Sequence, residues 1–181
     1  MGNKLQLMSL ISEMINEVGD LKNIISYPYT TYKRGENYVG RFKAEVNGEE
    51  QDITVLIERS SPSFKDNLTL PPVFDKNGDL YNISFNVSGD DAQFAKTNLP
   101  LYLKILKTVT EIVKDVINET DTDLPNNIYM LGSVSKEGIT GKNDTKLRYY
   151  RAILNSNLPA GYRMAEGKFY SFNILALQKT K

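Results

Sequence analysis

The stretch from about residue 99 to residue 118 constrains the fold more than any other part of the chain. Its apolar side chains recur at three- and four-residue steps and form one continuous stripe: Tyr102, Ile105, Leu106, Val109, Ile112, Val113, Val116 and Ile117. Such a stripe is typical of an amphipathic helix that packs on a core. Before it, and separated from it by a polar loop, residues 81–88 alternate between apolar and small polar side chains, as a strand with one buried face does. The sequence therefore predicts an α+β fold in which this helix covers a sheet.

The predicted centre of the domain is a β-α-β-α unit over residues 80–156. A short strand at 128–131 follows the first helix, and a basic, aromatic helix follows at 144–156. Because a β-α-β-α run deposits consecutive helices against the sheet that they cross, we expect both helices on one face. The sheet is expected to be mixed and to contain five to seven strands.

Four side chains on these helices carry specific expectations. Tyr150 shares an apolar stripe with residues 147 and 154, so its ring is expected to enter the core while its hydroxyl finds a polar partner. Arg148 lies beside that stripe, where its stem can pack and its guanidinium can bind a loop. On the first helix, Lys107 and Glu111 are expected to pair on a solvated side.

Two hairpins are expected to complete the sheet. Residues 38–59 alternate in two runs joined by Asn47-Gly48, which is the strongest short hairpin signal because both turn residues must reach positive φ. Residues 161–178 predict a second hairpin with its turn at Glu166-Gly167. Its last strand is apolar on both sides, as a central strand would be.

The remaining segments flank these elements within a single domain, residues 1–181. Residues 4–21 carry an amphipathic pattern and predict an N-terminal helix. Residues 24–32 are apolar and aromatic but contain Pro28, which permits only an edge strand or an extended segment. Residues 60–79 contain three prolines and predict a long loop, either functional or packed over an edge of the sheet.

Composition excludes several kinds of chemistry. The chain contains no cysteine and no histidine, so it has no disulfide, thiolate nucleophile, imidazole base or Cys/His zinc site. Residues 75–79 begin like a calcium loop, but the glycine is misplaced and no glutamate follows at the twelfth position, so a turn is predicted. The glycines between 132 and 142 lack phosphate-loop spacing. We therefore expect no metal, no cofactor and, without a long apolar run, no membrane span.

The 22 basic and 22 acidic residues are spread unevenly. From residue 133 onward nine basic residues stand against three acidic ones, a net charge of plus six, and the preceding residues carry minus six. Two interpretations stay open: the halves neutralise each other within one domain, or the basic half is a contact surface. The second interpretation predicts a nucleic-acid surface in which aromatic rings stack on bases beside cations. Its residues are Lys142, Lys146, Arg148, Arg151, Arg163 and Lys168, with Tyr149, Tyr162 and Tyr170.

Short motifs run through residues 81–162 in a recognisable order. They are the strand Ile83-Ser84-Phe85, Thr97 in the following loop, Thr108-Val109 in the first helix, the helix 147–154 with its Arg-x-x-Tyr-like pattern, and Gly161-Tyr162. In this order they resemble a segment of many uncharacterised tailed-phage proteins, some virion-associated or parts of very large phage polyproteins. The resemblance implies a phage origin and a place in, or delivery by, the virion. It brings no catalytic residues.

Three functional hypotheses follow from the sequence. The first is a non-enzymatic phage protein, a virion structural component or packaged accessory, located in the virion or the host cytoplasm. It would act through other phage proteins, as a homo-oligomer or virion-bound subunit whose contacts use residues 60–79 and weaken with salt. The second is the nucleic-acid binder described above. The third is an enzyme using carboxylates such as Asp90 and Asp91, with no catalytic residue assigned, because neighbouring side chains on a strand or turn usually point apart.

Overall fold

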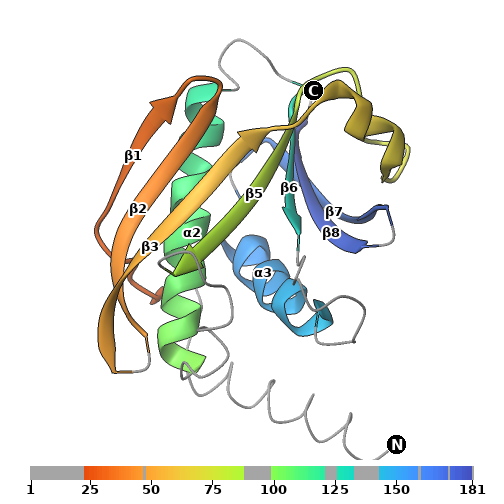
Figure 1. The fold of residues 1–181 in the computed structure, drawn as a ribbon. Coiled ribbons are helices and arrows are strands. Elements are labelled where there is room, and N and C mark those ends of the chain that lie inside the picture. Colours follow the sequence, from red (N-terminus) through yellow and green to blue (C-terminus); the bar gives the residue numbers. More distant parts are fainter. Residues whose placement is uncertain are drawn as a thin grey trace, which may run out of the picture.

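A computed structural model describes residues 23–46, 48–87, 99–120, 126–132, 143–158, 160–170 and 172–180. The predicted helix at 4–21, Thr97, and the Asp90-Asp91 pair lie outside these residues. Eight strands form one mixed sheet in the order β1-β2-β3-β5-β6-β8-β7-β4 (Figure 1). Their bounds are β1 Tyr29–Arg34, β2 Asn37–Val46, β3 Glu49–Arg59, β4 Leu68–Thr69, β5 Leu80–Val87, β6 Ile128–Gly132, β7 Tyr162–Phe169 and β8 Phe172–Lys179. Neighbouring strands are antiparallel except for the parallel pair of β5 and β6.

Both predicted α-helices pack on the same face of this sheet (Figure 1). Helix α2, Leu99–Thr120, buries its apolar stripe against β1, β2 and β3, and helix α3, Asn143–Asn157, packs beside it toward β8. The core between helices and sheet includes the inward residues of the 38–59 hairpin, with Ile53, Val55 and Ile57 fully buried. The fold is therefore a single-domain α+β fold with two helices on one face, and the sheet is larger than the five to seven strands expected.

The helix layer approaches the sheet closely at two points. At Gly40 in β2 an added Cβ would lie 2.6 Å from Cγ2 of Ile112, so the absence of a side chain lets α2 approach this strand. At α3, Tyr150 is 2 % exposed and its ring meets that of Phe85 edge to face, with centroids 6.0 Å apart. The expectation that the Tyr150 ring enters the core is confirmed.

The segment between β3 and β5 covers the opposite face at the other end of the sheet. Within residues 60–79, the structure has a 3-10 helix, η2 Pro62–Asn67, and the short strand β4, which pairs with β7. A second core forms beneath it from Leu68, Phe74, Leu80, Ile128, Met130, Ile174 and Ala176. The buried amide of Gln178 donates to the backbone carbonyls of residues 75 and 126 and accepts from the amide of residue 75, which fixes the turn. The segment thus packs over the sheet, as expected, but it is not a plain loop.

The predicted turn of the last hairpin is wrong by four residues. Glu166 and Gly167 lie inside β7, which continues until Phe169 pairs with Phe172 across the true turn at Tyr170, where φ is 53°. Gly167 serves close approach instead, because an added Cβ would lie 2.4 Å from Leu70 Cδ2 and 2.6 Å from the Thr69 carbonyl oxygen. The expectation that β8 is a central strand is confirmed, since it lies between β6 and β7.

The predicted solvated side of α2 is also wrong at Lys107, which is only 8 % exposed. Its ammonium group donates to the Asn157 side chain at the end of α3 and pairs with Glu111 at 2.8 Å. Burial raises the pKa of Glu111, but hydrogen bonds and charge from Lys107 and Lys114 outweigh it, so the net pKa is lowered. The pairing of Lys107 with Glu111 agrees with the prediction. The burial of Lys107 depends on where α3 ends, and the periodicity of α2 carries no information about that.

Candidate functional site

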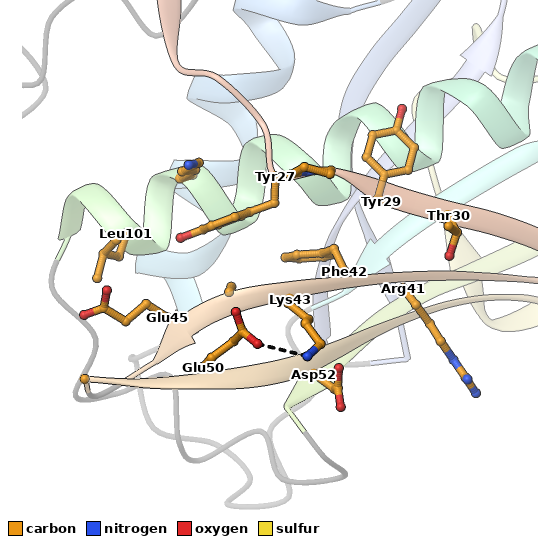
Figure 2. A pocket seen from close by; sticks show the side chains of 14 residues that line it. Tyr27, Tyr29, Thr30, Arg41, Phe42, Lys43, Glu45, Glu50, Asp52 and Leu101 are labelled. Atoms are coloured by element: carbon orange, nitrogen blue, oxygen red, sulfur yellow. Dashed lines mark hydrogen bonds and ion pairs between the residues drawn. The ribbon is translucent and has the colours of Figure 1, made fainter.

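An open groove follows the edge of β2 where β1 no longer covers it. The pairing of β1 with β2 begins at Tyr29 and Phe42, and β2 then continues over residues 43–46 with β3 on one side and no described strand on the other. The groove measures about 900 Å³ and reaches from the start of β1 past the hairpin turn to the first turn of α2. Residues 27–30, 41–45, 48, 50, 52, 101 and 104 line it (Figure 2).

The helix side of the groove is an aromatic stack with a cation on top. The rings of Tyr27 and Phe42 lie one over the other in Figure 2, with centroids 5.9 Å apart and planes 17° from parallel. The ammonium group of Lys104 lies 4.1 Å from the centroid of the Tyr27 ring, a cation–π distance. Burial raises the pKa of Tyr27, and a hydrogen bond from the Glu45 backbone offsets part of that rise. This wall is therefore apolar and already ordered.

The other side of the groove is charged. Lys43 pairs with Glu50 at 2.9 Å, and the strand register places Glu45 directly opposite Glu50 and Lys43 opposite Asp52. Like charges opposite each other on neighbouring strands are destabilising. Lys43 therefore offsets Glu50, and Glu45 stands beside a like charge. A cation brought in by a ligand would be favoured next to Glu45.

One buried hydroxyl fixes the segment that forms the groove wall. Thr108 is fully buried in the middle of α2, donates to the Lys104 carbonyl oxygen and accepts the backbone N–H of Tyr27, both at 2.9 Å. Thr110, two residues further, is also buried and donates to the Leu106 carbonyl oxygen. Of these two threonines, only Thr108 binds the segment that leads into β1, so the Thr108-Val109 motif has a structural role here.

Replacing Thr108 by valine is expected to lower the free energy of unfolding by about 1–2 kcal/mol, because the Tyr27 N–H loses its acceptor in a partly buried place. Thr110→Val is the same substitution at a threonine that does not bind another segment. It should lower the free energy of unfolding by about 0.5 kcal/mol or less. Chemical denaturation measures both values, and amide exchange at Tyr27 should accelerate only in the first variant. Equal losses in the two variants would show that the Thr108 contact does not anchor the segment.

Next to the groove, β1 forms an exposed edge of the sheet. Five of its six residues are exposed, and its outer side has no strand neighbour among the described residues. The Tyr29 hydroxyl donates to the Asp115 carboxylate of α2 at 2.5 Å. Burial and the acceptor Asp115 raise the pKa of Tyr29 well above its usual range. The strand is thus fixed to α2 on one face while its backbone edge stays open.

The structure divides the predicted nucleic-acid residues between the two faces of the sheet. On the helix side, Arg151 pairs with Glu166 of β7, and Tyr162 packs partly buried against the main core. On the opposite face, Arg163 donates to the Val73 carbonyl oxygen at 2.5 Å and lies over the Phe74 ring. Arg163 is therefore used in holding residues 60–79, away from Arg151.

Two more of the predicted nucleic-acid residues lie at the end of β7. Lys168 is exposed in β7, and Tyr170 is exposed at the neighbouring turn, where its ring meets that of Phe169. Lys142 lies outside the described residues. So do the side chains of Lys146, Arg148 and Tyr149, although their backbone belongs to α3.

Two further observations concern the described residues as a whole. They contain no group of three or more acidic side chains that could hold a metal ion. None of their helices is both long enough and apolar enough to cross a membrane.

The sequence analysis missed the groove because its residues come from four separate stretches. The available signal was Pro28, which marks where an edge strand must leave its neighbour. Ala44 and Val46 continue the alternating pattern of β2 beyond that point and predict a strand longer than its edge partner. No family model, curated protein or solved structure matches the chain.

Proposed function

We propose that this chain is a non-enzymatic bacteriophage protein, a virion structural component or packaged accessory, that acts through protein–protein contacts. The observation that carries the proposal is the open edge of the sheet: the exposed strand β1 and, beside it, residues 43–46 of β2, which have no described strand on this side and where one backbone group, that of Glu45, binds Tyr27. Proteins normally blunt or cover such edges, because unpaired backbone groups attract a further strand. An edge left open beside an ordered groove is a docking place for an extended segment of another protein. The resemblance of residues 81–162 to phage proteins supports the phage assignment.

The groove favours a partner segment with alternating apolar and basic side chains. An extended segment along β2 would place one set of side chains toward the Tyr27 and Phe42 rings and the other set toward Glu45. Apolar side chains suit the first wall and a Lys or Arg suits the second. A nucleic acid suits the same wall less well, because its three carboxylates, those of residues 45, 50 and 52, outnumber its two cations, Arg41 and Lys43.

Glu45→Lys is expected to lower incorporation into phage particles about tenfold, the effect of ~1.4 kcal/mol of lost contact energy. Glu58→Lys is the matched control: it is also an exposed glutamate of this hairpin, but it is not among the residues that line the groove. Quantitative mass spectrometry of purified particles measures the ratio of this chain to the major capsid protein. Absence of the wild-type chain from particles would overturn the virion assignment. An equal effect of both variants would overturn the role of the groove as the docking site.

A further inference from the structure

We propose that the outer edge of β1 pairs with β1 of a second copy, which makes a two-fold dimer with a continuous sheet. This inference deepens the proposed function by naming the partner of one edge, and it rests on that function only in treating the edge as a contact surface. The two ends of the sheet differ: β1 has six residues, five of them exposed, whereas β4 has two. At the β4 end, the short strand pairs with residues 168–169 of β7, and the segment after it contacts β7 at Gly167 and Arg163, so that edge is partly covered.

The pattern of side chains along β1 selects a register. Residues 29, 31 and 33 lie on the helix side, since they pair with Phe42, Gly40 and Tyr38, while residues 30 and 32 lie on the other side. A two-fold axis perpendicular to the sheet keeps each side chain on its own face of the sheet. Directly opposite residues must share a face, so one residue of β1 lies opposite the same residue of the second copy, at the axis. With Thr31 at the axis, the ladder covers residues 29–33 and ends at Pro28, which has no N–H to donate.

This register brings opposite charges together. Lys33 of the second copy then lies opposite Tyr29, whose hydroxyl donates to the Asp115 carboxylate. On the other face, Thr30 lies opposite Tyr32 of the second copy, which is a favourable β-branched and aromatic pair. Tyr32 is 41 % exposed in the single chain and is covered by this contact. In this register neither Lys33 nor Arg34 lies opposite the same residue of the second copy, so no like charges meet.

The helix layer leaves room for this arrangement. Helix α2 packs on β1, β2 and β3 and touches β2 most closely at Gly40. The β2 strands of the two copies would be three strand spacings apart, about 14 Å. Packed helices need only about 8–10 Å between their axes, so the two α2 helices would not collide. A ladder of five residue pairs is small beside the ~1,600 Å² of a standard interface, so the dimer is reversible and forms at high protein concentration.

Sedimentation velocity of the full chain between micromolar and several hundred micromolar tests the dimer. We expect a monomer–dimer equilibrium that weakens with salt, because Lys33 and Asp115 are exposed. Thr31→Lys places two cations face to face at the axis and should abolish the dimer, and circular dichroism should show that the exposed substitution leaves the fold intact. Lys33→Glu should raise the dissociation constant about tenfold, and adding Asp115→Lys should restore most of the affinity by exchanging the charges. Lys168→Glu is the control and should leave the affinity unchanged.

A wild-type chain that stays monomeric at low salt and at the highest concentration would overturn the proposal. A dimer that survives Thr31→Lys would overturn it as well, because that dimer uses another surface. Particle incorporation separates the proposal from the proposed function: a monomeric Thr31→Lys chain still found in particles contradicts neither the virion assignment nor the groove. A dimer of a chain that never enters particles contradicts the virion assignment alone.

Discussion

Replacing Tyr150 by alanine is expected to lower the free energy of unfolding by about 3–5 kcal/mol, the range for removing a large buried side chain. The ring lies at the junction of α3 and the sheet, edge to face against Phe85, and is almost completely buried. Its loss leaves a cavity between the helix layer and β5 that the surrounding side chains fill only in part. Urea denaturation followed by circular dichroism measures the change.

Tyr150→Phe separates packing from the polar end of the side chain. It keeps the ring and removes only the hydroxyl, so the loss should be about 1 kcal/mol. If Tyr150→Ala left the stability unchanged but removed partner binding, the residue would be a contact residue and its assignment to the core would be wrong. A loss of similar size in both variants would instead give the hydroxyl the main role.

Replacing Gly78 by alanine is expected to cost about 3 kcal/mol, near the upper end for forcing atoms into a packed place. A Cβ at this position would lie 2.1 Å from the backbone oxygen of Asn126, and backbone cannot turn aside as a side chain can. The clash falls where the 75–79 turn meets the start of β6, which is held by hydrogen bonds from Ile128 to the Asp79 carbonyl and from the Asp79 amide to Asn127. The two segments must separate to admit the methyl group.

Gly35→Ala is the control for Gly78→Ala. Gly35 has a positive φ of 64°, but nothing lies within 4 Å of its added Cβ, so only backbone strain of about 1 kcal/mol is expected. Thermal unfolding of the two variants side by side compares crowding with strain. A Gly78→Ala protein as stable as the Gly35→Ala protein would mean that β6 and the turn can move apart easily.

The elements set by local pattern could be predicted from the sequence. The stripe on α2 and the alternation in the 38–59 hairpin each specify a buried side, because a helix or a half-buried strand repeats its environment at a fixed period. Asn47-Gly48 added the connection between the two strands of the hairpin. These signals place both helices and the hairpin correctly before any tertiary contact is known.

Features that depend on distant contacts could not be predicted in this way. A glycine such as Gly167 indicates a turn and a close approach equally well, and only its contact with β4 distinguishes them. The pattern of α2 predicts a solvated Lys107, because the burial of this residue requires Asn157, 50 positions later. The groove could not be predicted for the same reason, because its walls meet only after α2 has packed against residues 27–29.

The position of β8 in the sheet has a consequence for the order of folding. β8 follows every other strand in the chain, yet it lies between β6 and β7 and contributes to both cores. During synthesis, β6 has only β5 beside it until residues 172–179 have left the ribosome. The pair of β7 and β4 meanwhile has no strand that joins it to the rest. Insertion of a late strand between earlier ones requires contacts distant in sequence, which slow folding, so the complete sheet closes in one late step.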